Sequence, residues 1–214
     1  MIKAVIFDLD GVLVESEHLH IEAEKQTLLK YGVRISSEEL HRYTGTTASF
    51  MFTELIERYK LNTTFKKMFD EKEKILFNLL RDNVKPTQGV MQLLMKLKGE
   101  DIKLAIASSS HKKLISHILR QMDVTDYFDF VVSSEDVAYG KPDPEVFLKA
   151  ASGLNVDPDE CLVIEDSKLG VEAAKKAGMK CVGYRNPHSG DQDLSEADIV
   201  IDNFSKLNLE HLLS

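Results

Sequence analysis

The sequence has no tryptophan, and it has only two cysteines among its 214 residues. Two cysteines are too few for a disulfide framework, and each lies in an apolar run, so we expect Cys161 and Cys181 to be buried thiols in a reducing cytoplasm. No run approaches the roughly 18 apolar residues of a membrane span, and the apolar start lacks the form of a signal peptide. The sequence therefore predicts a cytoplasmic protein with no membrane partner.

Basic residues are also scarce relative to acidic ones. The 27 Lys and Arg and 35 Asp and Glu residues give a net charge of −8, which argues against a nucleic-acid partner because such interfaces are normally basic. Hydrophobic residues at 43% and charged residues at 29% form an ordinary globular mixture. We expect a monomer, although the apolar helical faces described below would suit a subunit interface as well as a core.

Short apolar runs of the kind found in buried strands alternate with helical stretches along the chain. The predicted strands cover 2–7, 103–107, 128–132, 161–164 and 180–184, with an edge strand at 199–201. The predicted helices between them cover 90–98, 112–122, 145–151 and 169–177. This alternation predicts an α/β fold with a doubly wound, Rossmann-like parallel sheet.

One region interrupts the alternation, because it contains amphipathic helical patterns and no convincing strand. Its predicted core consists of Ala23, Thr27, Leu28, Tyr31, Phe52, Leu55, Ile56, Tyr59, Phe65, Met68, Phe69, Ile75, Leu76, Leu79 and Leu80. We predict a helical cap over 15–82, inserted into a core of 1–14 and 83–214. The linkers at 14–17 and 82–86 are its predicted hinges.

The first polar group at a strand end is Asp8-Leu9-Asp10-Gly11. Two carboxylates two positions apart start out on the same side of the chain, and Gly11 allows a sharp turn away from them. In open α/β sheets, ligands bind at this edge. The alternative is an Asp-rich turn that only ends the strand.

The second and third polar groups come before predicted helices. Ser108, Ser109 and Ser110 follow the 103–107 strand, where their hydroxyl and N–H groups could hold a phosphate or simply cap the helix. Asp143 is the predicted N-cap of the next helix, with Pro144 at its first position. Lys141 just ahead of them could neutralise a phosphoryl oxygen or a carboxylate, or it could be a solvated lysine.

The fourth polar group is Glu165-Asp166, which ends the 161–164 strand. Carboxylate oxygens on neighbouring strand ends suit Mg²⁺. A helix cap would account for Asp166 but would leave Glu165 unexplained. Because all four groups follow predicted strands, we expect them to meet in one site.

With these residues in view, the sequence resembles the haloacid dehalogenase-like superfamily, in particular its phosphatase and β-phosphoglucomutase-like branch with a helical cap. FDLDGVLVES, IASSS, GKPDPEVF and VIEDSKLGVEAAKKAG are similar to the four motifs of that family, in order. The resemblance implies that Asp8 attacks phosphorus to form an aspartyl-phosphate and that Asp10 is the general acid and base. It further implies that Mg²⁺ is held by Asp8, the backbone carbonyl of Asp10 and Asp166, with Glu165 acting directly or through water. Phosphate would be held by Ser108, Ser109 and Lys141.

Residues near the cap distinguish the branches of the family. Asp10 argues against C–halogen and phosphonate cleavage, because those members lack the second aspartate. Ser16 and His20 resemble the hinge hydroxyl and cap histidine of β-phosphoglucomutases, although His20 could also be a solvated residue. The loop at 44–49, TGTTAS, lacks the Lys and Arg with which those mutases grip a second phosphate. Arg42 nearby could substitute, or it could stand exposed on a helix.

The combined prediction is a Mg²⁺-dependent phosphomonoester hydrolase that acts on a small phosphorylated metabolite such as a sugar phosphate. His20, Thr44 and Thr47 are its candidate cap contacts to the substrate. A phosphosugar mutase and a non-catalytic module that senses a phosphorylated ligand are the alternatives. We expect the cap to close over the crevice and exclude water during the first step.

Overall fold

The computed structural model describes residues 1–81 and 83–207. Six parallel strands form one sheet in the order β3-β2-β1-β4-β5-β6. They are β1 (Ala4–Phe7), β2 (Lys103–Ala107), β3 (Phe130–Val132), β4 (Cys161–Glu165), β5 (Lys180–Tyr184) and β6 (Ile199–Ile201). The prediction of a doubly wound parallel sheet with β6 at its edge is therefore confirmed.

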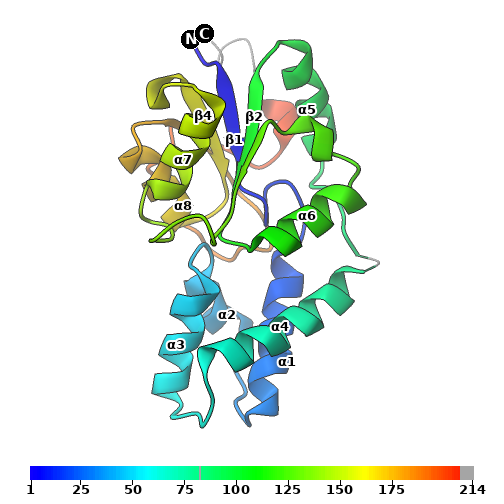
Figure 1. Ribbon diagram of the computed structural model, residues 1–214, viewed down its shortest axis with the longest axis vertical. Helices are drawn as coiled ribbons and strands as arrows, with labels where there is room; N and C mark the ends of the chain where they lie inside the picture. The colour runs from blue at the N-terminus through cyan, green and yellow to red at the C-terminus, as the bar shows by residue number, and fades with distance from the viewer. Residues whose placement is uncertain (82, 208–214) are drawn as a thin grey trace.

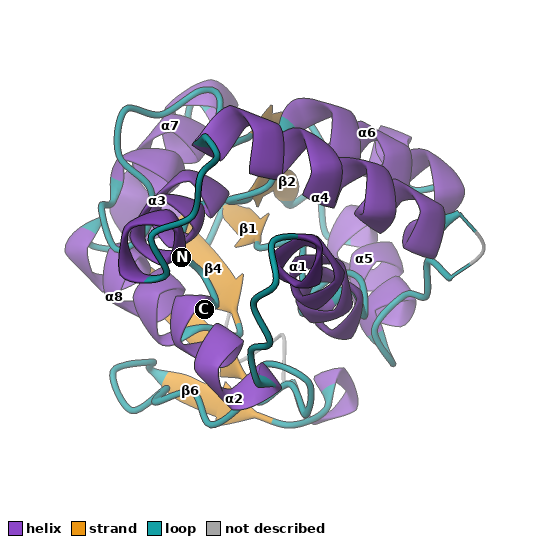
Figure 2. Ribbon diagram, turned by 90° about the horizontal axis from the view of Figure 1, so that it is seen from below, coloured by secondary structure: helices purple, strands orange, loops and turns teal. Residues whose placement is uncertain are grey.

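Helices cover both faces of this sheet, as Figures 1 and 2 show. Val5 and Phe7 of β1 face α5 (Val90–Gly99) and α6 (Lys112–Gln121), whereas Ala4 and Ile6 face α7 (Glu145–Leu154) and α8 (Lys168–Lys176). Successive residues of a strand point to opposite faces, so an apolar strand can fill two cores at once. This explains why the strand sequences are continuous apolar runs rather than alternating ones.

The predicted strand at 128–132 begins two residues later than expected. Thr125–Tyr127 form the short 3₁₀ helix η2, and the N–H of Asp129 donates to the carbonyl of Leu104 before the strand itself starts. Phe128 instead packs edge-to-face on Phe7, with the ring centroids 6.1 Å apart. Its apolar side chain therefore contributes to the core from outside the strand. The remaining short helices are η1 (His41–Tyr43), η3 (Pro158–Glu160) and η4 (Phe204–Lys206).

The helical insertion follows β1 and occupies the lower half of Figure 1. It contains α1 (Glu17–Lys30), α2 (Ser37–Leu40), α3 (Ala48–Arg58) and α4 (Phe65–Leu80). The insertion has a core of its own, in which Leu28, Phe52, Leu55 and Met68 are fully buried. We call this insertion the cap. Its predicted limits at 15 and 82 stay a prediction, and Asp82 lies outside the described residues.

The two linkers between cap and core lie side by side. The N–H of Glu15 donates to the carbonyl of Lys85 at 2.9 Å, and the N–H of Thr87 donates to the carbonyl of Leu13 at 3.0 Å. An antiparallel bridge joins Val14 to the neighbouring linker. The chain therefore enters and leaves the cap through a short hydrogen-bonded pair of segments.

Both cysteines are buried and carry free thiols, as expected. Burial raises the pKa of the Cys161 thiol to about 11 and also raises that of Cys181. Because the thiolate is the reactive form, we expect neither thiol to react with a disulfide reagent at pH 8 in the native protein, and both to react after unfolding in guanidinium. A thiol titration in each condition measures this, and a fast reaction of either cysteine in the native protein would contradict it.

None of the helices in the described ranges is both long and apolar enough to cross a membrane.

Candidate active site

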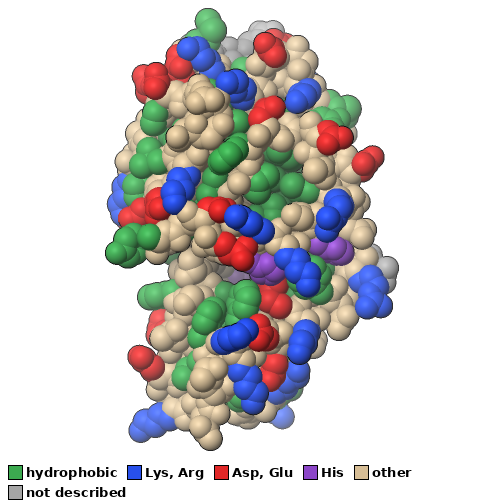
Figure 3. Space-filling view, in the orientation of Figure 1, with side chains coloured by type: hydrophobic (Ala, Val, Ile, Leu, Met, Phe, Trp, Pro, Cys, Tyr) green, Lys and Arg blue, Asp and Glu red, His purple; other side chains and the backbone are tan. Residues whose placement is uncertain are grey.

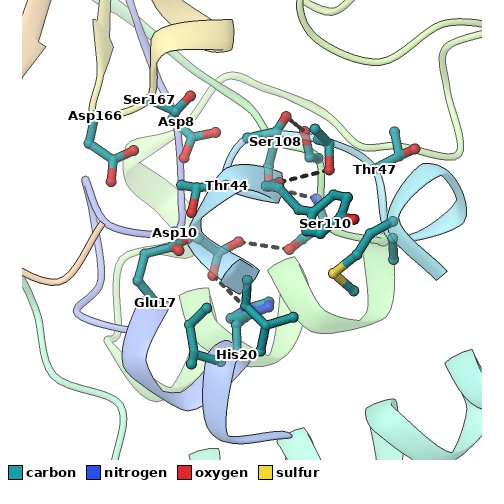
Figure 4. A pocket seen from close by; sticks show the side chains of 18 of the residues that line it. Asp8, Asp10, Glu17, His20, Thr44, Thr47, Ser108, Ser110, Asp166 and Ser167 are labelled. Carbon is teal, nitrogen blue, oxygen red and sulfur yellow. Dashed lines mark hydrogen bonds and ion pairs between the residues drawn. The ribbon is translucent and has the colours of Figure 1, made fainter. Parts of the chain in front are cut away.

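The carboxyl ends of β1, β2 and β4 meet at the edge of the sheet that faces the cap, where a chamber of about 90 Å³ lies between the two parts (Figure 4). The core contributes residues that follow these strands, and the cap contributes one face of α1 and the loop before α3. The lining residues used below are Asp8, Asp10, Glu17, His20, Glu24, Thr44, Thr47, Ser108, Ser109, Ser110, Glu165 and Asp166.

Asp8 and Lys141 form a buried ion pair at the centre of this site. The Lys141 ammonium donates to Asp8 Oδ1 at 2.5 Å, to Glu165 Oε1 at 2.6 Å and to the carbonyl of Ala107 at 3.2 Å. The Lys141 side chain is only 2% exposed, so the alternative of a solvated lysine is wrong. Burial alone would lower the pKa of Lys141, but the two carboxylates hold it above its usual value and keep the lysine charged.

Helix α7, which follows Lys141, begins at Glu145, the first residue of the predicted range, although Pro144 was expected at its first position. Pro144 occupies the N-cap position, and Asp143 accepts a hydrogen bond from the Glu145 N–H at 3.0 Å. Asp143 thus still satisfies an N–H group of the first turn, as an N-cap residue would.

Glu165 uses both of its oxygens within the protein. One oxygen accepts from Lys141, and the other accepts from the N–H groups of Asp166 and Ser167 at 2.8 Å each and from the Ser167 hydroxyl at 2.9 Å. Gly170 leaves room for this carboxylate, because a Cβ there would lie 1.9 Å from it. The structure thus makes Glu165 a positioning residue for Lys141, and its role toward Mg²⁺, directly or through water, stays a prediction.

Asp166 follows β4 and is 2% exposed. Its Oδ2 accepts from the Ser189 hydroxyl and lies 3.4 Å from Asn186 Nδ2. Gly11 packs against this carboxylate with a φ of +84°, and a Cβ there would lie 2.1 Å from Oδ2, so only glycine fits. Ser167 is the N-cap of α8, accepting from the Gly170 N–H at 3.1 Å, and the helix-cap alternative for Asp166 is therefore wrong.

The positive charge that the protein places in this site is too small to neutralise its carboxylates. Burial raises the pKa of Asp8 well above its usual range against the opposing charge of Lys141, and burial and Glu165 do the same for Asp166. Within 1–81 and 83–207, no three metal-ligating side chains converge. The buried carboxylates of Asp8 and Asp166 would hold a cation here, with the Asp10 carbonyl as the family resemblance implies and with water and phosphate completing its shell. That donor set suits Mg²⁺.

The side chain of Asp10 is held by three donors, two of them marked in Figure 4. The Ser16 hydroxyl and His20 Nε2 lie 2.5 and 3.1 Å from Oδ1, and the Ser110 hydroxyl lies 2.7 Å from Oδ2. Lys72 Nζ lies 3.2 Å from His20 Nδ1. Because an ammonium group can only donate, Nδ1 accepts and Nε2 carries the proton that it donates to Asp10. His20 is thus part of this network, and the solvated alternative is wrong.

The network also sets the charge of Asp10. Burial alone would raise its pKa, but the interaction with His20, with help from the hydroxyls of Ser16 and Ser110, outweighs burial. The pKa of Asp10 therefore lies well below its usual range, and the side chain is ionised at neutral pH.

The serines after β2 do not cap the next helix. His111 is the N-cap of α6, and its ring accepts from the Leu114 N–H at 3.4 Å, so the capping alternative for the serines is wrong. Ser108 is 1% exposed, and its hydroxyl accepts from the Ser110 N–H at 3.0 Å. The Ser109 hydroxyl donates to the carbonyl of Gly45 in the cap at 3.1 Å. Phosphate binding by Ser108 and Ser109 stays a prediction.

The cap loop packs directly on the core. Thr47 packs against Gly140, where a Cβ on residue 140 would lie 2.4 Å from the Thr47 methyl group. Thr47 is also the N-cap of α3, and its hydroxyl accepts from the Phe50 N–H at 3.2 Å. Thr47 therefore has a structural task that the sequence analysis did not anticipate. Thr44 differs, because its Oγ1 is buried and has no hydrogen-bond partner in the described part of the chain.

A wider crevice of about 920 Å³ opens beside the chamber at the waist between cap and core, seen in Figure 3. Exposed Phe50 and Tyr139 line it, and Thr47 and Ser109 separate it from the chamber. Arg42 is exposed on η1 and lines this crevice rather than the chamber. It therefore does not replace the basic cap residues of the mutases in this structure.

The comparisons with known proteins agree with this geometry. A family model described as haloacid dehalogenase-like hydrolase matches residues 5–184, a range that contains all four motifs. The chain belongs to this family. It is 38% identical over 192 residues to the phosphorylated carbohydrates phosphatase of Thermotoga maritima, covering 87% of this chain and 86% of that protein. It is 33% identical over 219 residues to the β-phosphoglucomutase of Bacillus subtilis, covering 98% and 93%.

Solved structures of haloacid dehalogenase-like proteins share the whole architecture, cap included. The crystal structure of CbbY from Rhodobacter sphaeroides in complex with phosphate has a TM-score of 0.88 at 26% identity, covering 97% of each chain. The family and its fold, predicted from four strand-end motifs, are thus confirmed. So is the prediction of an enzyme of the phosphatase type.

Several residues of this site were not predicted from the sequence. They are Glu17, Glu24, Lys72, Asn186 and Ser189. Asn186 and Ser189 follow an apolar strand at the same sheet edge, a signal that the sequence did contain. Lys72 recurs at helical spacing between Met68 and Leu76 on an apolar face, and a lysine in such a place needs a partner.

Proposed function

We propose that this protein is a Mg²⁺-dependent phosphomonoester hydrolase that acts on a small phosphorylated carbohydrate through an aspartyl-phosphate at Asp8. The observation that carries this proposal is the pair of carboxylates in one chamber. Asp8 is held by a buried lysine, and Asp10 is held by three donors. The carbohydrate part of the proposal is supported by the relative from Thermotoga maritima.

In the first step an oxygen of Asp8 attacks phosphorus, and the bond to the leaving oxygen breaks. Lys141 and Ser108 bind phosphoryl oxygens, where negative charge must be balanced during transfer. Bound Mg²⁺ supplies the further positive charge that lets an anionic carboxylate approach an anionic phosphate. Asp10 donates a proton to the leaving oxygen, so the sugar departs as a neutral alcohol.

In the second step water attacks the aspartyl-phosphate, Asp10 accepts its proton, and phosphate and free Asp8 result. The low pKa of Asp10 keeps it ionised before this step, as a base must be. A phosphate dianion nearby raises that pKa, because like charges disfavour ionisation. The same carboxyl group can therefore carry a proton in the first step and accept one in the second.

A phosphosugar mutase is the second candidate, favoured by Ser16 and His20 at Asp10 and by the relative from Bacillus subtilis. A mutase must hold a bisphosphate, and among the described residues neither Lys nor Arg lines the chamber. Hydrolysis is therefore the better supported reaction.

Incubation with β-glucose 1-phosphate and a trace of glucose 1,6-bisphosphate separates the two reactions. We expect free phosphate and glucose from the hydrolase. Conversion to glucose 6-phosphate without release of phosphate would overturn the proposal in favour of the mutase. Absence of turnover on a panel of sugar phosphates and p-nitrophenyl phosphate would favour a non-catalytic phosphate-sensing module.

A further inference from the structure

One wall of the chamber is formed by the cap helix α1. Glu17, His20 and Glu24 lie three or four residues apart, share a face of this helix and all line the chamber. His20 is engaged with Asp10 and Lys72. Glu24 is only 9% exposed, yet neither Glu24 nor Glu17 forms a hydrogen bond or ion pair with any residue that the structure describes.

The loop before α3 adds a third unpaired group to the same chamber. The neighbouring hydroxyls have local partners, since Tyr43 donates to Glu54 at 2.8 Å and Thr46 donates to the carbonyl of Tyr43 at 2.7 Å. Thr44 Oγ1, buried without a partner in the described ranges, is the exception. Figure 4 shows Thr44 and Glu17 near Asp10. Buried polar groups without partners are costly, so Glu24 and Thr44 Oγ1, with the half-buried Glu17 beside them, are suited to a ligand that completes their hydrogen bonds.

The chemistry of these groups restricts that ligand. Carboxylates accept hydrogen bonds and a hydroxyl can donate or accept, so the matching groups on a ligand are hydroxyls. A second phosphate or a carboxylate would instead face two acidic side chains in a chamber whose described lining contains neither Lys nor Arg. Lys72 lies behind His20 and does not line the chamber.

We propose that Glu24, with Glu17 and Thr44, binds the hydroxyl groups of the substrate and selects a neutral polyhydroxy monophosphate over one that carries a second anionic group. This inference rests on the proposed function, because it concerns the part of the substrate that leaves. Hydrogen bonds to a buried carboxylate strengthen binding of a ligand with hydroxyl groups, and repulsion between like charges weakens binding of a ligand with a second anionic group.

D-glucitol 6-phosphate and 6-phosphogluconate provide a matched pair of probes, because they differ only at the carbon farthest from phosphate, a hydroxymethyl group in one and a carboxylate in the other. We expect the wild-type kcat/KM to favour glucitol 6-phosphate by at least about a hundredfold, since a site built for hydroxyls strongly rejects a mismatched group. Glu24→Gln should narrow this preference by at least about tenfold, with slower turnover of glucitol 6-phosphate and faster turnover of 6-phosphogluconate.

Glu22→Gln is the control, because it makes the same change on the exposed face of the same helix. It should leave the preference as in the wild type. Thr44→Val, which keeps the shape of the side chain, should slow turnover of glucitol 6-phosphate by about tenfold and provides a second variant. A wild-type preference below about tenfold, or an unchanged preference in Glu24→Gln, would overturn the inference.

Wild-type turnover of p-nitrophenyl phosphate tests the proposed function separately, because this substrate has no hydroxyl groups for the wall to bind. Release of nitrophenol together with an unchanged preference in Glu24→Gln would overturn only the inference. Without release of phosphate from this substrate or from any sugar phosphate, the proposed function itself fails. The selectivity of this wall would then still be measurable by calorimetry. The quantity to compare is the affinity of the wild type and of Glu24→Gln for glucitol 6-phosphate and for 6-phosphogluconate.

Discussion

Asp8→Asn is expected to lower the rate of phosphate release by at least about 10⁴-fold, because an amide cannot attack phosphorus. Asp10 is held in place by Ser16, His20 and Ser110, and Glu165 is occupied by Lys141 and the following turn. The measurement is phosphate release from p-nitrophenyl phosphate and from a sugar phosphate under saturating Mg²⁺.

This variant should fold normally, so the loss of activity can be assigned to chemistry. Burial raises the pKa of Asp8, which means that the folded state disfavours its charged form, and a neutral amide of the same shape avoids that cost. We expect its melting temperature to equal or exceed that of the wild type. Asp70→Asn, at an exposed position of α4, is the matched control and should keep full activity.

The covalent intermediate can be tested in the same pair of proteins. Borohydride reduces an acyl phosphate to an alcohol, so wild-type enzyme quenched during turnover should contain homoserine at position 8. Asp8→Asn should contain none. Residual activity above about a hundredth of the wild-type rate in this variant would contradict the role of Asp8, as would homoserine at another position.

Removal of divalent cations by a chelator should lower activity by at least about a thousandfold, and added Mg²⁺ should restore it, because a bound cation contributes several kcal/mol to charge stabilisation. The reason lies in the charges of the site. Asp8 and Asp166 are buried with raised pKa values, and Lys141 alone cannot balance them and Glu165.

A second measurement separates cation binding from catalysis. A ligand that binds only the folded state stabilises it, so Mg²⁺ without substrate should raise the melting temperature of the chelator-treated protein. Asp166→Asn should lose most of this increase, whereas Asp198→Asn, at the amino end of β6 and away from the site, should keep it. Full activity in excess chelator would contradict the prediction, and so would a melting temperature that does not respond to Mg²⁺.

The sheet could be predicted from the sequence because its strands are buried on both faces. The runs at 103–107, 180–184 and 199–201 match β2, β5 and β6 residue for residue. The strand at 128–132 was placed too early, since Phe128 is apolar for a different reason, its packing on Phe7 from outside the sheet. Apolar character predicts burial, and it predicts a strand only where the backbone can also pair.

The candidate site was predicted as far as strand ends define it. Asp8, Lys141 and Asp166 converge because parallel strands bring their carboxyl ends to one edge. The partners of the two Glu165 oxygens depend on distances between segments far apart in the sequence, and so does the lack of a partner for Thr44 Oγ1 in the described ranges. The same holds for Lys72, whose partner His20 lies on another helix.

The hydrogen-bonded linkers of the cap also bear on how such a protein can diversify. Because the N–H of Glu15 and the carbonyl of Lys85 bind each other, the two ends of the insertion are already joined where the core begins. The entropy of closing a loop grows only with the logarithm of its length, so a shorter, longer or differently folded insertion between the same two segments changes the stability of the core little. The cap can therefore change during evolution while the residues proposed for phosphoryl transfer stay in the core. We expect a cap grafted from a relative to bring the substrate preference of that relative with it.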